Sequence, residues 1–189
     1  MTFDVARVRS HFPSLESGVA HFDGPGGTQT PLSVGQAICK TMTGPLANQG
    51  TLTQAERNAE AAVDNARSAM ADLLGSSPEG IFFGRSMTQI TFDIARTLAQ
   101  NWGPGDEIVA SRLDHDANVR PWVRYAEQSG ATLRWIEFDP ATGHLDISDV
   151  ESVINERTKL VAITAASNLI GTRPDIPAIS KAVHAVGGL

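Results

Sequence analysis

Apolar residues recur along the chain at two spacings, which together predict helices alternating with strands. The helical spacing is clearest over 54–74, where Thr53 and Glu56 form a capping box and Gly75 can end the helix. The same pattern predicts further helices over 4–12, 31–44, 88–101, 118–129, 147–156 and 177–186. Thr30 is the predicted N-cap of the helix that ends near residue 44, and Ser148 and Glu151 form a second capping box in the helix over 147–156.

Short apolar runs predict strands at Ala20–Phe22, Ile81–Phe83, Glu107–Ser111, Thr132–Ile136 and Lys159–Thr164. Because strands and helices alternate from residue 80 onward, we expect an α/β fold of three layers, with a mostly parallel sheet covered by helices on both faces. The loops after parallel strands gather at one edge of such a sheet, and ligands bind there. Polar residues far apart in the sequence should therefore meet at that edge.

Composition narrows the class of protein. The 189 residues are 41% hydrophobic and 19% charged with a formal net charge of −6, which suits a soluble globular protein and gives no reason to expect nucleic acid or a membrane as partner. There is no signal-peptide core and no apolar run long enough to cross a bilayer. The single cysteine, Cys39, excludes an internal disulfide and indicates a cytoplasmic setting; its apolar helical surroundings predict a buried small residue rather than a nucleophile.

The segment Gly84–Thr88 joins a predicted strand to a helix N-terminus. Free backbone N–H groups and the helix dipole favour an anion at such a turn, and we expect that anion to be a phosphate group. The alternative is that Ser86 simply caps the helix. The segment matches neither the dinucleotide fingerprint nor the P-loop, so both interpretations stay open.

The segment Asp114–Asn118 follows an apolar strand and places a histidine between two acids. His115 can stack on a flat ligand or act as an acid or base, or it can be hydrogen-bonded to neighbouring loop groups. Asp114 and Asp116 are of a type that binds metals, but no second His or Cys lies at ligand spacing, so we expect no metal; either acid can cap the next helix. After the last predicted strand, Asn168 can donate its amide to a ligand oxygen or serve as a turn residue.

Taken in order, these segments resemble the class V aminotransferase family, in particular its cysteine desulfurase-like branch. The resemblance is carried by Ala20–Thr28, Asn48–Thr51 before the long helix, Gly84–Thr88, Asp114–Asn118 and the loop with Asn168. Members of this family are pyridoxal 5′-phosphate (PLP) enzymes of the aspartate aminotransferase fold. The resemblance implies an N-terminal segment over 1–19 that contributes to a small domain, and a partial PLP-binding large domain over 20–189.

The resemblance also implies a role for each candidate site residue. Met87 and Thr88 should hold the PLP phosphate through backbone N–H groups and the Thr88 hydroxyl. His115 should lie flat against the pyridine ring, and Asn168 should donate to the phenolic oxygen of the ring. Asn118 should sit close to the ring and support its loop. The substrate should be an amino acid and the enzyme a homodimer, with no nucleic acid or membrane as partner.

Some positions depart from the family pattern. Asp116 stands where many desulfurases have a second histidine, and Ser86–Gln89 replaces a Gly-Thr-Thr-Glu-like phosphate loop. In the family, the early loop is usually richer in Asn and Ala than Gly24-Pro25-Gly26-Gly27 is here. These differences resemble a divergent subgroup, so desulfurase, lyase, epimerase and aminotransferase activities all stay open.

A larger departure concerns the lysine that forms the Schiff base with PLP. The chain contains only Lys40, Lys159 and Lys181, and none matches the family's lysine position. Leu189 looks like the first residue of a further strand. We therefore expect the chain to be an N-terminal portion of a PLP enzyme that is incomplete at its C-terminus and not catalytically competent alone. Because an incomplete parallel sheet exposes an edge and apolar faces, we also expect the chain to aggregate or to be held in an oligomer. Two alternatives remain: a non-enzymatic truncated paralogue that binds a phosphorylated ligand or pairs with a full-length partner, and an unrelated nucleotide-binding domain.

Overall fold

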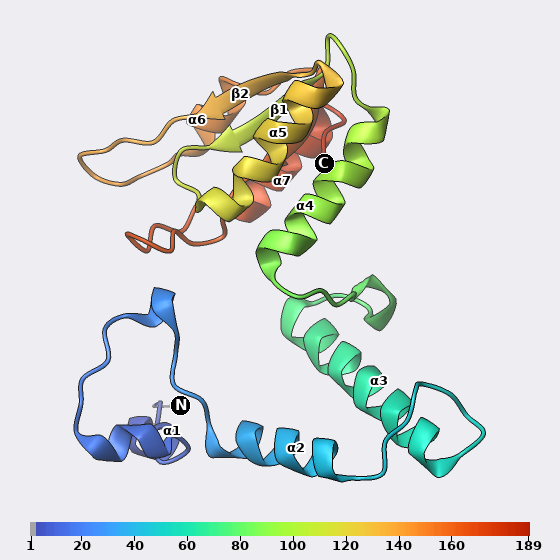
Figure 1. The fold of residues 1–189 in the computed structure, drawn as a ribbon. Helices are drawn as coiled ribbons and strands as arrows, with labels where there is room; N and C mark the ends of the chain where they lie inside the picture. The colour runs from blue at the N-terminus through green and yellow to red at the C-terminus, as the bar shows by residue number, and fades with distance from the viewer. Residues whose placement is uncertain (1–2) are drawn as a thin grey trace. The chain divides into compact units, whose positions relative to one another are not determined.

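The computed structural model describes residues 3–189 and divides into two compact units (Figure 1). The first unit is Met1–Phe82 and the second is Phe83–Leu189. The domain boundary near residue 20 that the resemblance implies concerns a complete family protein, and it stays a prediction.

The first unit consists of helices joined by loops. Its elements are α1 (Val5–Arg9), α2 (Leu32–Thr43) and α3 (Gln54–Leu74), with the 3-10 helices η1 (Pro13–Ser17), η2 (Gly24–Gly26) and η3 (Pro78–Gly80). The capping box predicted for α3 is confirmed, because the Glu56 N–H donates to Thr53 Oγ1 over 3.2 Å and the Thr53 N–H donates to Glu56 Oε2 over 2.9 Å. Gly75 ends α3 at φ 65°, a left-handed conformation that glycine adopts without strain.

Two local expectations for the first unit are wrong. Ala20–Phe22 is not a strand, since the described part of this unit offers no neighbouring strand to share its backbone hydrogen bonds. The first helix ends at Arg9 instead of residue 12, because Phe12 precedes Pro13 and is pushed into an extended conformation. The start of α2 shifts by one residue, with Pro31 instead of Thr30 as its N-cap.

Side chains of the first unit are mostly exposed. Among those residues of 3–82 whose burial the structure describes, only Ala71 is buried. Phe22 and Leu52 are 93% and 87% exposed. The expectation that Cys39 is buried is therefore wrong: α2 has no buried residue, and the cysteine lies exposed on it. The described residues of the first unit therefore do not form a hydrophobic core of their own.

The second unit contains a parallel sheet of three strands. They are β1 (Glu107–Ser111), β2 (Thr132–Ile136) and β3 (Thr158–Ala162), in the order β2-β1-β3. The helices are α4 (Met87–Leu98), η4 (Ala99–Asn101), η5 (Asp116–Asn118), α5 (Arg120–Ser129), α6 (Ile147–Glu151) and α7 (Ile176–Ala185). The three strands predicted after residue 100 are confirmed. Ile81–Phe83 is not a strand, because it has no place in this sheet, and Phe82 and Phe83 are 58% and 54% exposed.

The sheet is the middle layer of three. Successive residues of a strand point to opposite faces. Val109 accordingly lies in a core cluster with residues of α6 and α7, whereas Ile108 lies in a second cluster with residues of α4 and α5. All five residues of β1 are buried, as expected for a middle strand covered on both faces. This arrangement confirms the predicted three-layer α/β fold with a parallel sheet.

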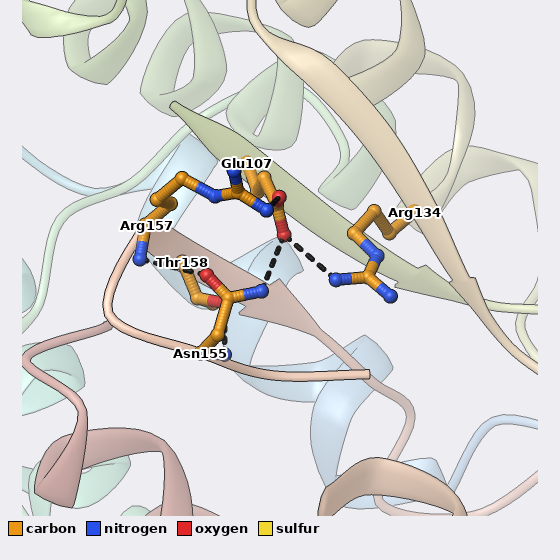
Figure 2. A network of polar contacts seen from close by, with 5 residues as sticks. All are labelled: Glu107, Arg134, Asn155, Arg157 and Thr158. Atoms are coloured by element: carbon orange, nitrogen blue, oxygen red, sulfur yellow. Dashed lines mark hydrogen bonds and ion pairs between the residues drawn. The ribbon is translucent and has the colours of Figure 1, made fainter. Parts of the chain in front are cut away.

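A buried carboxylate joins the strands at the amino edge of the sheet (Figure 2). Glu107 begins β1, and its side chain, only 7% exposed, lies 3.0 Å from Arg134 Nη1 of β2 and 2.6 Å from Arg157 Nη2 just before β3. Asn155 Nδ2 donates to the same carboxylate over 2.8 Å, and the Asn155 N–H donates to Thr158 Oγ1 over 3.0 Å. These contacts hold β2 and the entry to β3 on either side of β1.

Two further expectations concern α6 and the end of the chain. The N-cap of α6 is Asp146, which forms the capping box with Asp149, so the box predicted at Ser148 and Glu151 is wrong and the helix is shorter than predicted. Leu189 does pair as a strand residue: its N–H donates to the Lys159 carbonyl over 3.0 Å, and its carbonyl accepts from the Val161 N–H over 2.9 Å. This alternation is the hydrogen-bond pattern of a parallel ladder along β3.

Candidate functional site

The strand order creates a crevice at the carboxyl edge of the sheet. The chain leaves β1 for α5 on one face of the sheet, and it leaves the neighbouring strand β3 for α7 on the opposite face. Adjacent parallel strands whose connections diverge in this way form a topological switch point, where ligands of α/β proteins bind. The loops that diverge here are those that carry His115 and Asn168.

The structure brings His115 and Asn168 to one cavity of about 490 Å³ at this edge. Its other lining residues come from the loops after all three strands: Arg112, Leu113, Asp114, Asp116, Phe138, Pro140, Ser167, Leu169 and Ile170. Small-molecule sites commonly measure roughly 300–1,000 Å³, so the cavity can hold a ligand the size of a substituted aromatic ring.

His115 is exposed and its orientation is held by its own loop. Its Nδ1 accepts a hydrogen bond from the Ala117 N–H over 3.0 Å, which makes His115 the N-cap of η5. Because Nδ1 acts as an acceptor, the neutral ring carries its proton on Nε2. A ring held in this way can offer its face to a flat ligand. The loop contact predicted as the alternative to ligand stacking is therefore present, and it is compatible with stacking.

Asn168 lies on a loop anchored at both ends. The N–H of the buried Ser167 donates to the Thr172 carbonyl over 2.8 Å. Thr172 Oγ1 donates to the Gly143 carbonyl over 2.7 Å, which ties the loop to the turn that follows β2. The exposed Asn168 side chain has no hydrogen-bond partner among residues 3–189, so its amide is available to a ligand.

Asn118 uses both ends of its amide inside the protein. Its Nδ2 donates to Asp114 Oδ1 over 2.7 Å, and its Oδ1 accepts from Trp122 Nε1 over 3.3 Å. Burial raises the pKa of Asp114 above its ordinary value, although hydrogen bonds from Asn118 and from the Thr164 N–H act in the opposite direction. These contacts give Asn118 a supporting position in the loop, and its closeness to a bound ring stays a prediction.

The N-terminus of α4 presents free backbone N–H groups. Ser86 Oγ accepts from the Gln89 N–H over 3.2 Å, so Ser86 does cap the helix. The N–H groups of Met87 and Thr88 in the first turn have no acceptor among the described residues, and Thr88 is exposed. Capping and anion binding are thus compatible at this turn. Neither residue lines the cavity, but α4 packs against η5, the turn that follows His115.

Sequence reasoning did not single out Arg112 or the pair Leu169 and Ile170 as site residues. The Arg112 guanidinium lies 3.9 Å from the centre of the Trp135 ring, and its Nε lies 3.5 Å from Glu137 Oε1. The signal for Arg112 is its position directly after a buried strand. The signal for the apolar pair is its place in a loop beside Asn168, where Leu169 is 87% exposed.

Other candidate chemistry finds little support in the structure. Asp116 Oδ1 lies 3.0 Å from Arg120 Nη2 and so forms an ordinary helix-surface ion pair. Within residues 3–189, no group of three or more His, Cys, Asp or Glu side chains is placed to hold a metal ion. No helix in the same range has the length and apolar character needed to cross a membrane. The glycine-rich loop lines a separate cavity of about 340 Å³ in the first unit, with Gly24, Gly27 and Thr28 among its residues.

The doubly wound parallel sheet, with a cavity and the candidate ligand-binding groups at its switch point, defines the fold as a three-layer α/β fold. Comparison with known proteins identifies the family. Residues 20–189 match the family described as Aminotransferase class-V. The chain belongs to the class V aminotransferase family, which confirms the resemblance found in its sequence.

Individual relatives agree with this assignment. The chain is 38% identical over 189 residues to the uncharacterized protein MT3887 of Mycobacterium tuberculosis, an alignment that covers 100% of this chain and 48% of the relative. It is 32% identical over 196 residues to a cysteine desulfurase of Dickeya dadantii, covering 98% of this chain and 47% of the relative. The apo structure of a cysteine desulfurase from Thermococcus onnurineus superposes with a TM-score of 0.91 at 28% identity, covering 100% of this chain and 47% of that one. The chain spans about half the length of the curated relatives it matches.

Proposed function

We propose that the chain supplies the N-terminal half of a PLP site in an enzyme that acts on an amino acid, as a cysteine desulfurase or a related class V aminotransferase does. The observation that carries the proposal is the meeting of His115 and Asn168 at one cavity on the carboxyl edge of the sheet. Family membership and the cysteine desulfurase relatives support PLP as the ligand.

The donor groups of the site fit PLP. A phosphate needs several N–H donors, and the first turn of α4 leaves those of Met87 and Thr88 free. An aromatic ring needs a flat partner, and the His115 ring is exposed and held by its Nδ1 hydrogen bond. A phenolic oxygen needs a donor, and the amide of Asn168 is unused within the described chain.

In the proposed site, this chain binds and orients the cofactor. Met87 and Thr88 bind the phosphate through backbone N–H groups, with the Thr88 hydroxyl as a further donor. His115 supports the ring and Asn168 donates to its phenolic oxygen, while Asn118 holds the loop beneath His115. When bound, PLP supplies an electron sink for the bonds at the α-carbon of an amino acid.

Covalent attachment of PLP needs a lysine, and none of the three lysines of this chain lies at the proposed site. Lys159 Nζ lies 3.4 Å from Asp106 Oδ1 at the amino end of the sheet, opposite the cavity. Lys40 lies on α2 of the first unit, and Lys181 is exposed on α7. None of the three lines the cavity. We therefore expect the chain alone to bind PLP without attaching it covalently.

We also propose that the protein works as a cytoplasmic homodimer. Large apolar side chains of the first unit, such as Phe22 and Leu52, are almost fully exposed, and burial of such side chains at an interface favours association. The single cysteine, Cys39, is compatible with a reducing compartment.

Binding of pyridoxine 5′-phosphate, measured by equilibrium dialysis, tests the proposed cofactor site. This analogue lacks the aldehyde of PLP, so it cannot react with surface amines and reports only non-covalent binding. His115→Ala should weaken binding by about tenfold through loss of the ring contact, whereas His184→Ala, at an exposed position on α7, should leave it unchanged.

Two results would count against the proposal. Absence of saturable binding to the unmodified protein would contradict the site as a whole. Equal affinity of the His115→Ala and His184→Ala proteins would contradict the role of His115 as the ring platform.

A further inference from the structure

One side chain joins the two loops that carry the candidate site. Asp114 Oδ2 accepts from the backbone N–H of Thr164 over 2.9 Å, across 50 residues of sequence. Its other oxygen, Oδ1, accepts from Asn118 Nδ2 over 2.7 Å. Among the residues that the structure describes, no other hydrogen bond or ion pair connects the loop after β1 with the loop after β3.

The position of this link in the fold gives it a specific effect. β1 and β3 are neighbours whose connections leave on opposite faces, so nothing in the sheet itself holds their loops together beyond the strand ends. Asp114 directly precedes His115. Thr164 begins the turn that leads to Asn168, and its Oγ1 donates to the Ala166 carbonyl over 2.7 Å. The Asp114 carboxylate therefore joins the residue before His115 to the start of the turn that leads to Asn168.

The link continues into the core on the α5 side. Asn118 Oδ1 accepts from Nε1 of Trp122, a residue that is 6% exposed and belongs to the cluster with Ile108. The half-buried Asp114 carboxylate is thus tied to a rigid part of the helix layer through Asn118. A carboxylate removed from water costs free energy unless it is well hydrogen-bonded, and here both of its oxygens are used.

We propose that Asp114 is a positioning residue of the PLP site proposed above: its carboxylate bridges the loops after β1 and β3 and sets the separation between the His115 ring and the Asn168 amide. Asp114 also lines the cavity, but its two carboxylate oxygens are engaged by Asn118 and by the Thr164 N–H, so we assign its effect on the cofactor to the positions of His115 and Asn168. Among the described residues, no hydrogen bond joins Asp114 to the phosphate turn at Met87 and Thr88, so we expect phosphate binding at this turn to be independent of the bridge.

The test compares two probes on the same set of variants, Asp114→Ala, Asp114→Asn and the matched control Glu127→Ala, which removes an exposed carboxylate from α5. Pyridoxine 5′-phosphate engages ring and phosphate groups, and inorganic phosphate engages the α4 turn alone. Asp114→Ala should raise the Kd for pyridoxine 5′-phosphate by about tenfold, since it frees two loops to move. The inorganic phosphate titration, followed through the Met87 and Thr88 amide resonances, should change by less than about twofold because no phosphate contact is lost.

Asp114→Asn keeps one oxygen to accept from the Thr164 N–H but loses the acceptor for Asn118, so its affinity should lie between those of Asp114→Ala and the unmodified protein. If Asp114→Ala fails to fold, the affinity of Asp114→Asn for pyridoxine 5′-phosphate tests the positioning role by itself. Equal pyridoxine 5′-phosphate affinity in Asp114→Asn and Glu127→Ala, or a parallel loss of inorganic phosphate binding, would overturn the positioning role. If the unmodified protein binds inorganic phosphate but no pyridoxine 5′-phosphate, the proposed function fails instead.

Discussion

Replacing Glu107 with glutamine should destabilise the second unit by about 2 kcal/mol, because hydrogen bonds to a charged group contribute roughly 1.5–3 kcal/mol each. The buried carboxylate has contacts at 3.0 Å to Arg134, 2.6 Å to Arg157 and 2.8 Å to Asn155 (Figure 2). Glutamine leaves one acceptor and turns an N–H₂ group toward donors. The Arg134 and Arg157 side chains are 36% and 65% exposed, so they can return to water, which limits the loss.

The pH dependence of this loss has a defined sign. Burial alone would raise the pKa of Glu107, but hydrogen bonds from Arg134 and Asn155 and the charges of Arg134 and Arg157 outweigh it, so the pKa lies below its ordinary value of 4.5. A carboxylate with a lowered pKa stabilises the fold above its unfolded-state pKa, and that contribution disappears as pH falls through the folded-state pKa. The stability difference between the unmodified and Glu107→Gln proteins should therefore be constant above about pH 5 and shrink below it.

Urea unfolding followed by tryptophan fluorescence measures this effect on the second unit alone, since Trp102, Trp122 and Trp135 are the only tryptophans and all lie within it. Glu127→Gln is the matched control, because it removes the same charge from an exposed position on α5. Equal unfolding midpoints for the two variants, or a difference that grows as the pH is lowered, would refute the account of the Glu107 contacts.

Three more outcomes follow from the geometry. Gly84→Ala should destabilise the second unit by about 1–3 kcal/mol in the same urea assay, which is the usual cost of overpacking. The new Cβ would lie 2.4 Å from Ile90 Cγ1, whereas Gly103 has open space around it, so Gly103→Ala should leave the stability unchanged. Borohydride reduction of the protein mixed with PLP should attach no stoichiometric label to Lys40, Lys159 or Lys181, as read by peptide mass spectrometry, and full labelling of one of them would disprove the proposed non-covalent site. Sedimentation velocity should show self-association because the first unit exposes Phe22 and Leu52, and a dilute, stable monomer would count against the homodimer.

The sheet was predictable where local signals and tertiary surroundings agree. Glu107–Ser111 forms a short apolar run, and as the middle strand it is buried on both faces. Ile81–Phe83 is also a short apolar run, yet it is not a strand, because strand formation depends on a neighbour that the run itself cannot specify. At α6, Asp146 and Ser148 are both good capping residues two positions apart, and local preference does not choose between them.

The meeting of two candidate residues at one cavity was predictable, but the contacts that connect their loops were not. Loop positions after strands indicated His115 and Asn168, and parallel topology implied that they would meet. The hydrogen bond from the Thr164 N–H to Asp114 spans 50 residues and involves a backbone donor that has no sequence signature. The stacking of Arg112 on Trp135 likewise depends on β1 lying beside β2, which only the fold establishes.

The central claim is that one ligand joins the α4 turn to the loops after β1 and β3. Its most direct test is a titration of the ¹⁵N-labelled protein with pyridoxine 5′-phosphate, followed through the backbone amides of Met87 and Thr88 and the side-chain amide of Asn168. The account predicts that all three resonances shift and saturate with one common Kd. Unchanged resonances at these positions, or saturable shifts confined to residues 24–28 of the first unit, would contradict it.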